Sequence, residues 1–360
     1  MCKNWAIGRV RTAISSAFVT RAGRLAVTFV TSSTPLRTDA LSTRSSGLNS
    51  RAANIRAPGF AAVRHVLIFH GKRIQMFRQL GLIGCGLMGG SFALAMKRAG
   101  LVKHVVGYSK SPSTVITAQK MGVIDQMAES ALMAVSGADI VLIAVPVAAT
   151  EATLRAIRHL VHPNTLFMDV GSTKANVVDA ARRVLRERLP SFVPAHPIAG
   201  KEVSGITHAD ATLYQDAQVV LTPVLETDMN LIERARAAWT GIGAQVRVMT
   251  PDAHDTAFAA VSHLPHLLAF AAYLGVAHQA DGAQFLDLAG PGFRDFTRIA
   301  ASDPAVWRDV LLANRTQVLA QAEMFKTMLY KFESAMREGQ ADVIESLIKE
   351  AAAGRSNWKK

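Results

Sequence analysis

The amino-acid sequence predicts an α/β fold, a doubly wound parallel sheet that is followed by an all-helical domain. Between Met76 and about residue 250, short apolar stretches alternate with stretches of helix-forming residues, and this alternation is typical of parallel sheets. A glycine-rich turn joins the first of these strands to the first helix. From Ala253 to Ala352, Ala- and Leu-rich helical periods dominate, with breaks expected at 290–292 (Gly-Pro-Gly) and 303–304 (Asp-Pro).

The length and the composition allow two domains and argue against several classes of protein. A chain of 360 residues can bury a large core. We expect an α/β domain at 76–250, a helical domain at 251–350 and a frayed tail at 351–360. Cys2 and Cys85 are the only cysteines, so neither a disulfide framework nor a cysteine-based zinc site is expected. No apolar run approaches the ~20 residues that a membrane-spanning helix needs, so we expect no membrane partner.

The net charge of +13 is concentrated near the N-terminus. Residues 1–75 contain twelve Lys and Arg residues and one acid, Asp39, which gives this segment a charge of +11 and leaves +2 for the remaining 285 residues. Because the body of the chain is nearly neutral, a general role in binding nucleic acid is not supported. That function would depend on the N-terminal segment alone.

The N-terminal segment is open to three interpretations. Its Arg- and Ser/Thr-rich, acid-poor composition is typical of a mitochondrial transit peptide or of a disordered basic arm. Met76 stands at the first residue of the first predicted strand, so residues 1–75 are alternatively upstream sequence translated from a misassigned start. We favour this last interpretation, and we expect a cytoplasmic protein rather than an organellar one.

The predicted elements follow one another in a regular order along the α/β domain. We expect strands at 76–83, 104–108, 139–145, 165–170, 192–195, 218–222 and 245–249. We expect helices at 91–99, 112–121, 148–160, 173–188 and 228–241. The third strand, DIVLIAV, is apolar throughout after its first residue, as expected for a strand that is buried on both faces.

The stretch GLIGCGLMGGSFA at 81–93 predicts a dinucleotide-binding turn of the Rossmann type. Gly84, Gly86 and Gly89 have G-x-G-x-x-G spacing, in which the first glycine allows a tight turn, the second lets a pyrophosphate approach, and the third lets helix and strand pack closely. The free N–H groups at the start of the helix favour phosphates. A glycine-rich turn without a ligand is the alternative, which the strand-turn-helix context disfavours. The other candidates for cofactor contact are Leu87, Met88 and Val145.

The end of the second strand indicates which dinucleotide binds. An acid usually stands there and holds the ribose 2′-hydroxyl of NAD, but here the residue is Ser109, followed by Lys110. A serine does not repel a 2′-phosphate, and the lysine can attract it. We therefore predict a preference for NADP, with NAD as the alternative.

Three further stretches combine polar side chains with apolar or Gly/Pro-rich surroundings. DVGSTK at 169–174 and AHPIAGKE at 195–202 each follow a predicted strand. Ligands of doubly wound sheets bind beyond the carboxyl ends of the strands, so both stretches would face the nicotinamide end of the crevice. The third set lies in the helical part and comprises His254-Asp255, SHLPH at 262–266 and FRDFTR at 293–298.

These motifs, in this order and spacing, resemble those of prephenate dehydrogenases. The resemblance rests on GLIGCGLMGGSFA, DVGSTK, HPIAGKEVSG, SHLPH and GFRDFTRIAASDP with a following Trp, and it runs from about Met76 to about Lys349. The family includes arogenate and dual-specificity cyclohexadienyl dehydrogenases. It implies a Rossmann-type domain followed by an all-helical dimerisation domain, and therefore a homodimer through the helical domain. It also implies oxidative decarboxylation of prephenate to 4-hydroxyphenylpyruvate, in tyrosine biosynthesis.

The resemblance assigns roles to particular residues. His196 would take the proton of the substrate 4-hydroxyl as hydride leaves for the nicotinamide, and a histidine titrates in the right range for this task. Ser172 resembles the residue that hydrogen-bonds both that histidine and the hydroxyl. Arg298 matches a substrate-binding arginine, and a guanidinium suits a bidentate grip on a carboxylate of the dianionic substrate.

The remaining polar residues of the motifs each keep two interpretations. His266 either faces the substrate or is a core histidine whose ring is satisfied by backbone. Glu202 and Asp295 either gate the pocket or serve only as ion-pair partners. Lys174 either helps to hold the substrate or caps a loop. Trp307 is expected to pack rather than to take part in the chemistry.

No metal site is expected. A metal site is suggested by four polar residues, His254, Asp255, His263 and His266. The two histidines of SHLPH share one face of a helix if Pro265 permits a helix there. No third ligand has motif spacing, and neither hydride transfer nor the decarboxylation requires a metal.

Several alternatives stay open at this point. An arogenate-preferring enzyme would differ only in what contacts the side chain of the substrate. A β-hydroxyacid or imine reductase shares the architecture, but the segments around His196 and Arg298 argue against it. If the protein were a non-catalytic NADP-binding module, nothing would explain why His196, Ser172 and Arg298 occur together. We expect neither a fused chorismate mutase segment within residues 1–75 nor a regulatory ACT domain after residue 350.

Overall fold

The computed structural model describes residues 68–69, 72–73 and 77–358. Strand β1 (Ile68–Phe69) pairs antiparallel with β2 (Lys72–Arg73). The expectations for the rest of residues 1–75, and for Met76 as the start of the first strand, lie outside the described residues.

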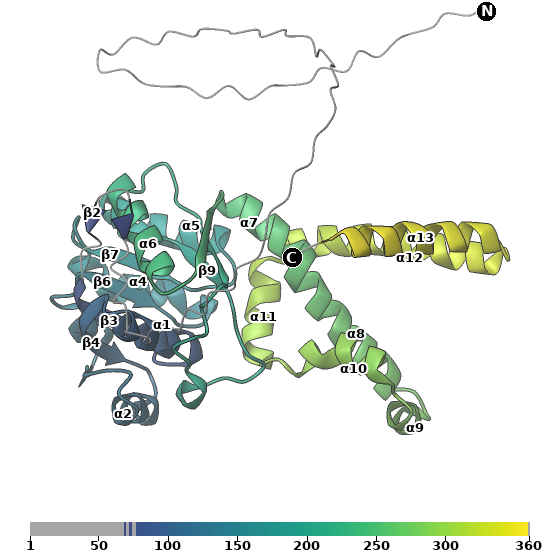
Figure 1. Cartoon of the computed structure of the whole chain (residues 1–360), viewed down its shortest axis with the longest axis horizontal. Helices are drawn as coiled ribbons and strands as arrows, with labels where there is room; N and C mark the ends of the chain where they lie inside the picture. Colours follow the sequence, from purple (N-terminus) through teal and green to yellow (C-terminus); the bar gives the residue numbers. More distant parts are fainter. Residues whose placement is uncertain (1–67, 70–71, 74–76, 359–360) are drawn as a thin grey trace, which may run out of the picture. The chain divides into compact units, whose positions relative to one another are not determined.

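The main sheet is parallel and doubly wound, as predicted (Figure 1). Its strands are β3 (Phe77–Ile83), β4 (Val102–Tyr108), β5 (Gln126–Met127), β6 (Ile140–Ile143), β7 (Leu166–Asp169) and β8 (Phe192–Val193). Their order in the sheet is β5-β4-β3-β6-β7-β8, and every neighbouring pair is parallel. The chain therefore winds outward from β3 in one direction and then from β6 in the other. The topological switch point, where such sheets bind ligands, lies between β3 and β6.

Helices cover both faces of this sheet. They are α1 (Leu87–Arg98), α2 (Pro112–Lys120), α3 (Ala131–Val135), α4 (Thr150–Ile157), α5 (Ala175–Leu185) and α6 (Met229–Gly241). Side chains alternate along a strand, so Leu142 of β6 packs with α1 and α6 on one face, while Val141 and Ile143 pack with α4 and α5 on the other. Burial on both faces explains the apolar third strand of the sequence.

Short 3-10 helices complete this domain. They are η1 (Val147–Ala149), η2 (Arg158–Leu160), η3 (Arg186–Ser191) and η4 (Ile206–His208). Strand β5 and helix α3 were not predicted, because both are shorter than the window in which a hydrophobic period can be recognised.

A second sheet corrects the prediction of one continuous parallel sheet. Strands β9 (Ala195–Ile198), β10 (Gln218–Leu221) and β11 (Gln245–Val248) form it in the order β11-β10-β9. β9 runs antiparallel to β10, and β10 runs parallel to β11. The single strand expected at 192–195 is two strands, because Pro194 has no N–H for a ladder and separates β8 from β9.

The rest of the chain is helical, as predicted. The helices are α7 (Pro251–Phe258), α8 (Leu264–Ala277), α9 (Gly282–Asp287), α10 (Pro291–Thr297), α11 (Pro304–Ala313), α12 (Arg315–Arg337) and α13 (Ala341–Asn357). A π-helical turn, η5 (Ala259–His263), joins α7 to α8, and η6 (Arg298–Ala301) follows α10. Both predicted breaks are helix starts, since Pro291 and Pro304 each occupy a first-turn position. The tail expected to fray is instead helical to Asn357, because α13 packs along α12.

The continuous stretch Pro251–Ala277 is long and apolar enough, by length and composition, to cross a membrane. A single such helix is weak evidence, because helices of protein cores pass the same test. Two polar residues of this stretch, His254 and Asp255, are buried and hydrogen-bond to the α/β domain. Only 28% of its apolar window is buried within the described chain.

Candidate active site

A cavity of about 400 Å³ opens beyond the carboxyl ends of β3, β6 and β7, against helix α11. The segments that line it come from several parts of the chain. They are 86–88 after β3, 144–147 after β6, 170–172 after β7, His196 and Pro197 of β9, the loop 199–205, and residues 302–303, 306–307 and 309–310 at α11. The cavity therefore lies at the switch point of the sheet, between the two predicted domains.

The glycine turn has the geometry that a dinucleotide requires. Gly84 has φ +97°, a conformation that side chains disfavour, and its N–H donates to the Tyr108 carbonyl at 2.8 Å. A Cβ on Gly89 would lie 2.1 Å from the Gly84 carbonyl oxygen, so this position must be glycine for helix α1 to approach β3. A Cβ on Gly86 would meet nothing within 4 Å, which leaves open space where a pyrophosphate would approach the backbone.

The other cofactor candidates divide into two groups. Leu87, Met88 and Val145 line the cavity. Ser109 and Lys110 follow the last residue of β4, and β4 is the strand next to the glycine turn. Lys110 is exposed and Ser109 is half-buried. This is the edge where the ribose of the adenosine half would lie in a fold of this type.

His196 lies in β9 at the wall of the cavity and is largely buried. Its Nδ1 is 2.8 Å from Nε2 of His254, and its ring stands edge-on to Phe258 with 4.9 Å between ring centroids. Its Nε2 has no protein partner among the described residues and is not among the buried unpartnered atoms, so it is open to the cavity. Burial lowers the pKa of His196 well below its usual value, and the nearby His254, Lys174 and His263 lower it further.

Ser172 lines the same cavity, but the predicted hydrogen bond between its hydroxyl and His196 is not present. The Nδ1 position of His196 is taken by His254 instead. The Ser172 hydroxyl is thus left on the cavity wall, where a substrate hydroxyl could reach it.

Lys174 does not reach the cavity, and the prediction that it helps to hold the substrate is corrected. Its side chain is completely buried. The ammonium forms an ion pair with Asp169 and donates to the Ala195 carbonyl at 2.7 Å. Asp169 also accepts the N–H of Gly171 at 2.8 Å and of Ala195 at 3.1 Å. The pair therefore fastens β7 to β9, directly behind His196.

Arg298 and Glu202 form an ion pair with each other, although 96 residues separate them. Glu202 lines the cavity from the loop 199–205, and Arg298 begins η6. Both side chains are substantially exposed, so the pair is accessible to a dianion that competes for the guanidinium. Asp295, one helical turn before Arg298 in α10, is exposed and not among the cavity-lining residues.

His266 lies beside the cavity rather than in its lining. Its Nδ1 donates to the Ser262 carbonyl at 2.9 Å, and its ring stacks on Trp307 with centroids 3.5 Å apart. Trp307 itself lines the cavity. Both interpretations of His266 therefore retain support, since backbone satisfies one nitrogen while the ring packs behind the cavity wall.

No group of His, Cys, Asp and Glu side chains within the described residues has the arrangement of a metal site. Pro265 does permit a helix, since α8 begins at Leu264. His263 nevertheless contacts Asn314, with 3.0 Å between its Nδ1 and the amide nitrogen, and His266 bonds to backbone. From the sequence, His254 and Asp255 belong to the third polar set and are given no role besides that of metal candidates, and Asn314 is not singled out. Their signal was a cluster of polar residues in an apolar helical region.

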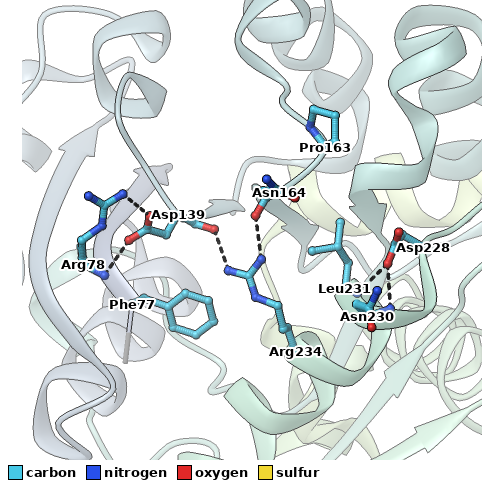
Figure 2. Close-up of a pocket in the computed structure, with 9 residues that line it drawn as sticks. All are labelled: Phe77, Arg78, Asp139, Pro163, Asn164, Asp228, Asn230, Leu231 and Arg234. Carbon is cyan, nitrogen blue, oxygen red and sulfur yellow. Dashed lines mark hydrogen bonds and ion pairs between the residues drawn. The ribbon is translucent and has the colours of Figure 1, made fainter. Parts of the chain in front are cut away.

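A second cavity, of about 530 Å³, lies at the opposite edge of the sheet, near the amino ends of β3 and β6. Figure 2 shows that its charged side chains are bonded to other protein groups. Arg234 of α6 donates to the carbonyls of Asn164 at 2.6 Å and Asp139 at 3.3 Å, and Arg78 pairs with the Asp139 carboxylate at 2.9 Å. These bonds tie α6 to the edge of the sheet, and this cavity has none of the chemistry of the first.

The glycine turn at the switch point and the accessible imidazole across the cavity from it define a dinucleotide-dependent dehydrogenase. Comparison with known proteins gives its family. Residues 92–248 match the nucleotide-binding domain of prephenate dehydrogenase, and residues 250–350 match the dimerization domain. The chain belongs to the prephenate dehydrogenase family, which confirms the resemblance of the sequence motifs and makes it an oxidoreductase.

Individual relatives agree with this assignment. The prephenate dehydrogenase of Bacillus subtilis (strain 168) is 36% identical over 280 residues, which are 77% of this chain and 75% of that protein. The cyclohexadienyl dehydrogenase of Zymomonas mobilis is 31% identical, over 78% of this chain and 96% of the relative. The crystal structure of Aquifex aeolicus prephenate dehydrogenase with hydroxyphenyl propionate and NAD+ is similar at a TM-score of 0.73 and 33% identity, covering 79% of this chain and 99% of that one.

Proposed function

We propose that the protein catalyses the NAD(P)-dependent oxidative decarboxylation of prephenate to 4-hydroxyphenylpyruvate. The observation that carries this proposal is the open Nε2 of His196, which faces the same cavity as the glycine turn. The named activities of the relatives in Bacillus subtilis and Aquifex aeolicus support it.

His196 acts as the general base. The 4-hydroxyl of the substrate gives its proton to Nε2, while the hydride on C4 leaves and C4 becomes a carbonyl carbon. The bound dinucleotide supplies the acceptor for that hydride. The bond from C1 to its carboxylate then breaks and CO2 leaves. The electron pair of that bond completes the aromatic ring and passes to the C4 oxygen, which takes the proton back from His196 and becomes the phenol hydroxyl of the product. Because burial lowers the pKa of His196, the imidazole is neutral and ready to accept the proton at neutral pH.

Arg298 binds one of the two substrate carboxylates. In the described structure it is paired with Glu202, which lines the cavity, whereas Arg298 itself is not among the lining residues. An incoming dianion would replace Glu202 as the partner of the guanidinium, so Glu202 also acts as a gate. Asp295 is proposed to assist in positioning Arg298, because it lies one turn away on the preceding helix.

NADP is proposed as the preferred cofactor, with NAD as the alternative. Ser109 brings no negative charge to the end of β4, and the exposed Lys110 can pair with a 2′-phosphate. The relative from Aquifex aeolicus is in complex with NAD+, so this preference would distinguish the present chain from it. Replacing Ser109 by Asp should shift the ratio of kcat/KM for NADP over NAD toward NAD. An unchanged ratio would contradict the proposal.

The helical domain is proposed to form a homodimer. Residues 250–350 match a dimerization domain, and helix α12 has only Val318 and Ala335 buried within the described chain. The remaining apolar side chains of α12 are available to a second copy.

The test of the activity is a set of initial rates with prephenate or arogenate, each with NADP or NAD, on the full chain. Activity with prephenate is expected. Activity with arogenate alone would keep the mechanism and change the substrate, an outcome that the cyclohexadienyl dehydrogenase relative makes relevant. Cofactor binding without turnover in any combination would contradict the proposal and favour a non-catalytic module or a reductase of another substrate.

A further inference from the structure

We propose that His254 and Asp255 form a positioning relay that fixes the tautomer of His196, so that Nε2 of His196 is always the atom that takes the substrate proton. The proposal deepens the function proposed above and rests on it for the origin of the proton. Neither His254 nor Asp255 lines the cavity. They act through His196 and are positioning residues.

A chain of short hydrogen bonds connects the three side chains. His196 Nδ1 lies 2.8 Å from His254 Nε2, and His254 Nδ1 lies 2.8 Å from Asp255 Oδ1. All three are buried, and His254 is fully so. His254 is further held by Phe258, with 4.4 Å between their ring centroids.

Two backbone N–H groups, which can only donate, set the donor and acceptor of each hydrogen bond between these three side chains. The backbone N–H of Lys174 donates to Asp255 Oδ1 at 2.8 Å, and the N–H of Ala175 donates to Oδ2 at 2.9 Å. Both are at the N-terminus of α5, which also favours a negative charge there. These bonds and His254 keep the pKa of Asp255 below its usual value despite burial, so the carboxylate is ionised and accepts from every partner.

The tautomers follow from this ionised carboxylate. His254 must carry its proton on Nδ1 in order to donate to Asp255, which leaves a lone pair on its Nε2. His196 must then donate from Nδ1, which leaves the lone pair of its own Nε2 toward the cavity. The general base is thus prepared in one tautomer by two backbone amides on the far side of the relay.

One lysine and two aspartates are buried around His196. Asp169 of β7, Asp255 of α7 and Lys174 at the start of α5 are the charged groups of this cluster, and the two imidazoles of the relay and His263 of η5 are its titratable neutral groups. With the imidazoles neutral the cluster carries −1, and one proton taken from the substrate brings it to zero. Burial and the neighbouring His254, Lys174 and His263 lower the pKa of His196, so His196 is neutral in the resting protein.

A third helix holds the relay in place. The side-chain amide of Asn314, between α11 and α12, donates to the Asp255 carbonyl at 2.8 Å. The π-helical turn η5 comes directly after the helix that carries His254 and Asp255. Such turns often occur at functional sites because they shift side chains out of helical register.

The first test is the tautomer of His196 in the full chain, by two-bond 1H–15N correlation NMR of 15N-histidine-labelled protein. The His196→Asn variant assigns the signal. We expect a protonated Nδ1 and an unprotonated Nε2 near neutral pH. A protonated Nε2 in the wild-type protein would overturn the proposal, whatever the enzyme activity.

The second test separates positioning from structure. His254→Phe keeps a ring beside Phe258 but cannot accept from His196, so kcat should fall about 10²-fold or more while substrate KM and cofactor Kd stay within about 2-fold. His254→Gln offers an amide oxygen to Nδ1–H and should restore at least about 10-fold of that loss. The exposed His162→Gln is the control and should leave kcat unchanged.

The outcomes distinguish this proposal from the proposed function. A kcat of His254→Phe within about 3-fold of wild type, with the His196 tautomer unchanged, would overturn the relay. If His254→Phe does not fold, the relay is tested by the tautomer of His196 in the wild-type protein and by the kcat of His254→Gln. A wild-type protein without turnover of prephenate or arogenate would overturn the proposed function, and the tautomer measurement would then decide the relay alone.

Discussion

His263 is a residue whose burial should be visible in the pH dependence of stability. Burial lowers its pKa to about 4. An unfolded histidine has a pKa near 6.5, so between about pH 6.5 and 4 the unfolded state binds more protons than the folded state. The free energy of unfolding should therefore fall as pH drops through this window, by about 3 kcal/mol from His263 alone, and stay level above it.

Urea unfolding at intervals between pH 8 and pH 4 measures this dependence. His263→Gln should reduce the slope below pH 6.5, because the substituted residue does not titrate. His196 and His254, whose pKa values burial also lowers, should account for the slope that remains. A free energy of unfolding that rises as the pH falls would contradict the description of these histidines as buried and neutral.

Lys174 gives a second prediction about stability. Lys174→Met would leave the carboxylate of Asp169 buried without its cation, so we expect a loss of about 3–5 kcal/mol in unfolding free energy. The exposed Lys120→Met should change it by less than about 0.5 kcal/mol. Equal effects of the two variants in chemical denaturation would show that the buried ion pair does not fasten the strands.

The glycine turn gives a prediction at the scale of one element. Gly89→Ala would place a methyl group against the Gly84 carbonyl and should destabilise the protein. Gly86→Val has open space around its side chain, so the thermal midpoint should change little, while the dinucleotide Kd should rise at least about 10-fold because the side chain fills the approach to the backbone. Thermal melts and fluorescence titration with NADPH measure the two effects. Normal cofactor binding by the Gly86→Val variant would show that the pyrophosphate does not approach the backbone at this position.

Most of the elements could be predicted because their hydrophobic pattern extends over many residues and because Gly, Pro or Asp marks their ends. The α/β order, the helical second domain and the glycine turn are of this kind. The second sheet could not be predicted in the same way. Strand β9 looks like a continuation of β8, and only its antiparallel partner β10, some twenty residues later, shows that the chain has left the first sheet.

The site was predictable where a motif carried the information, as for His196 at the cavity wall and Glu202 with Arg298. Lys174 was misplaced because a lysine next to a catalytic motif looks the same in sequence whether it faces substrate or a buried carboxylate. The link from His196 to His254 spans 58 residues and depends on how α7 packs on β9, which no local pattern encodes. The catalytic and substrate-binding roles themselves stay predictions.

At the scale of the whole molecule, α12 and α13 run side by side (Figure 1), and much of their apolar surface is exposed. Leu319 and Met324 of α12 are 61% and 68% exposed. Exposed apolar faces of this extent are typical of subunit interfaces. Replacing both residues by Glu should weaken the proposed homodimer at least about 10-fold, because two carboxylates would be desolvated in each subunit.

Light scattering coupled to size-exclusion chromatography, over a dilution series, measures this association. Lys120→Glu, an exposed change of charge on α2 of the α/β domain, is the control and should leave the dimer intact. A wild-type protein that stays monomeric at all concentrations would contradict the proposed homodimer.

Hydride transfer, proton transfer to His196 and loss of CO2 are proposed to occur in one cavity. Measuring reduced cofactor and released CO2 together from prephenate, for the wild-type chain and for His196→Asn, tests this directly. We expect one CO2 per reduced cofactor in the wild type, and a kcat that falls by about 10²–10⁴-fold in the variant with cofactor Kd unchanged. Reduced cofactor without CO2, or a variant as fast as wild type, would contradict it.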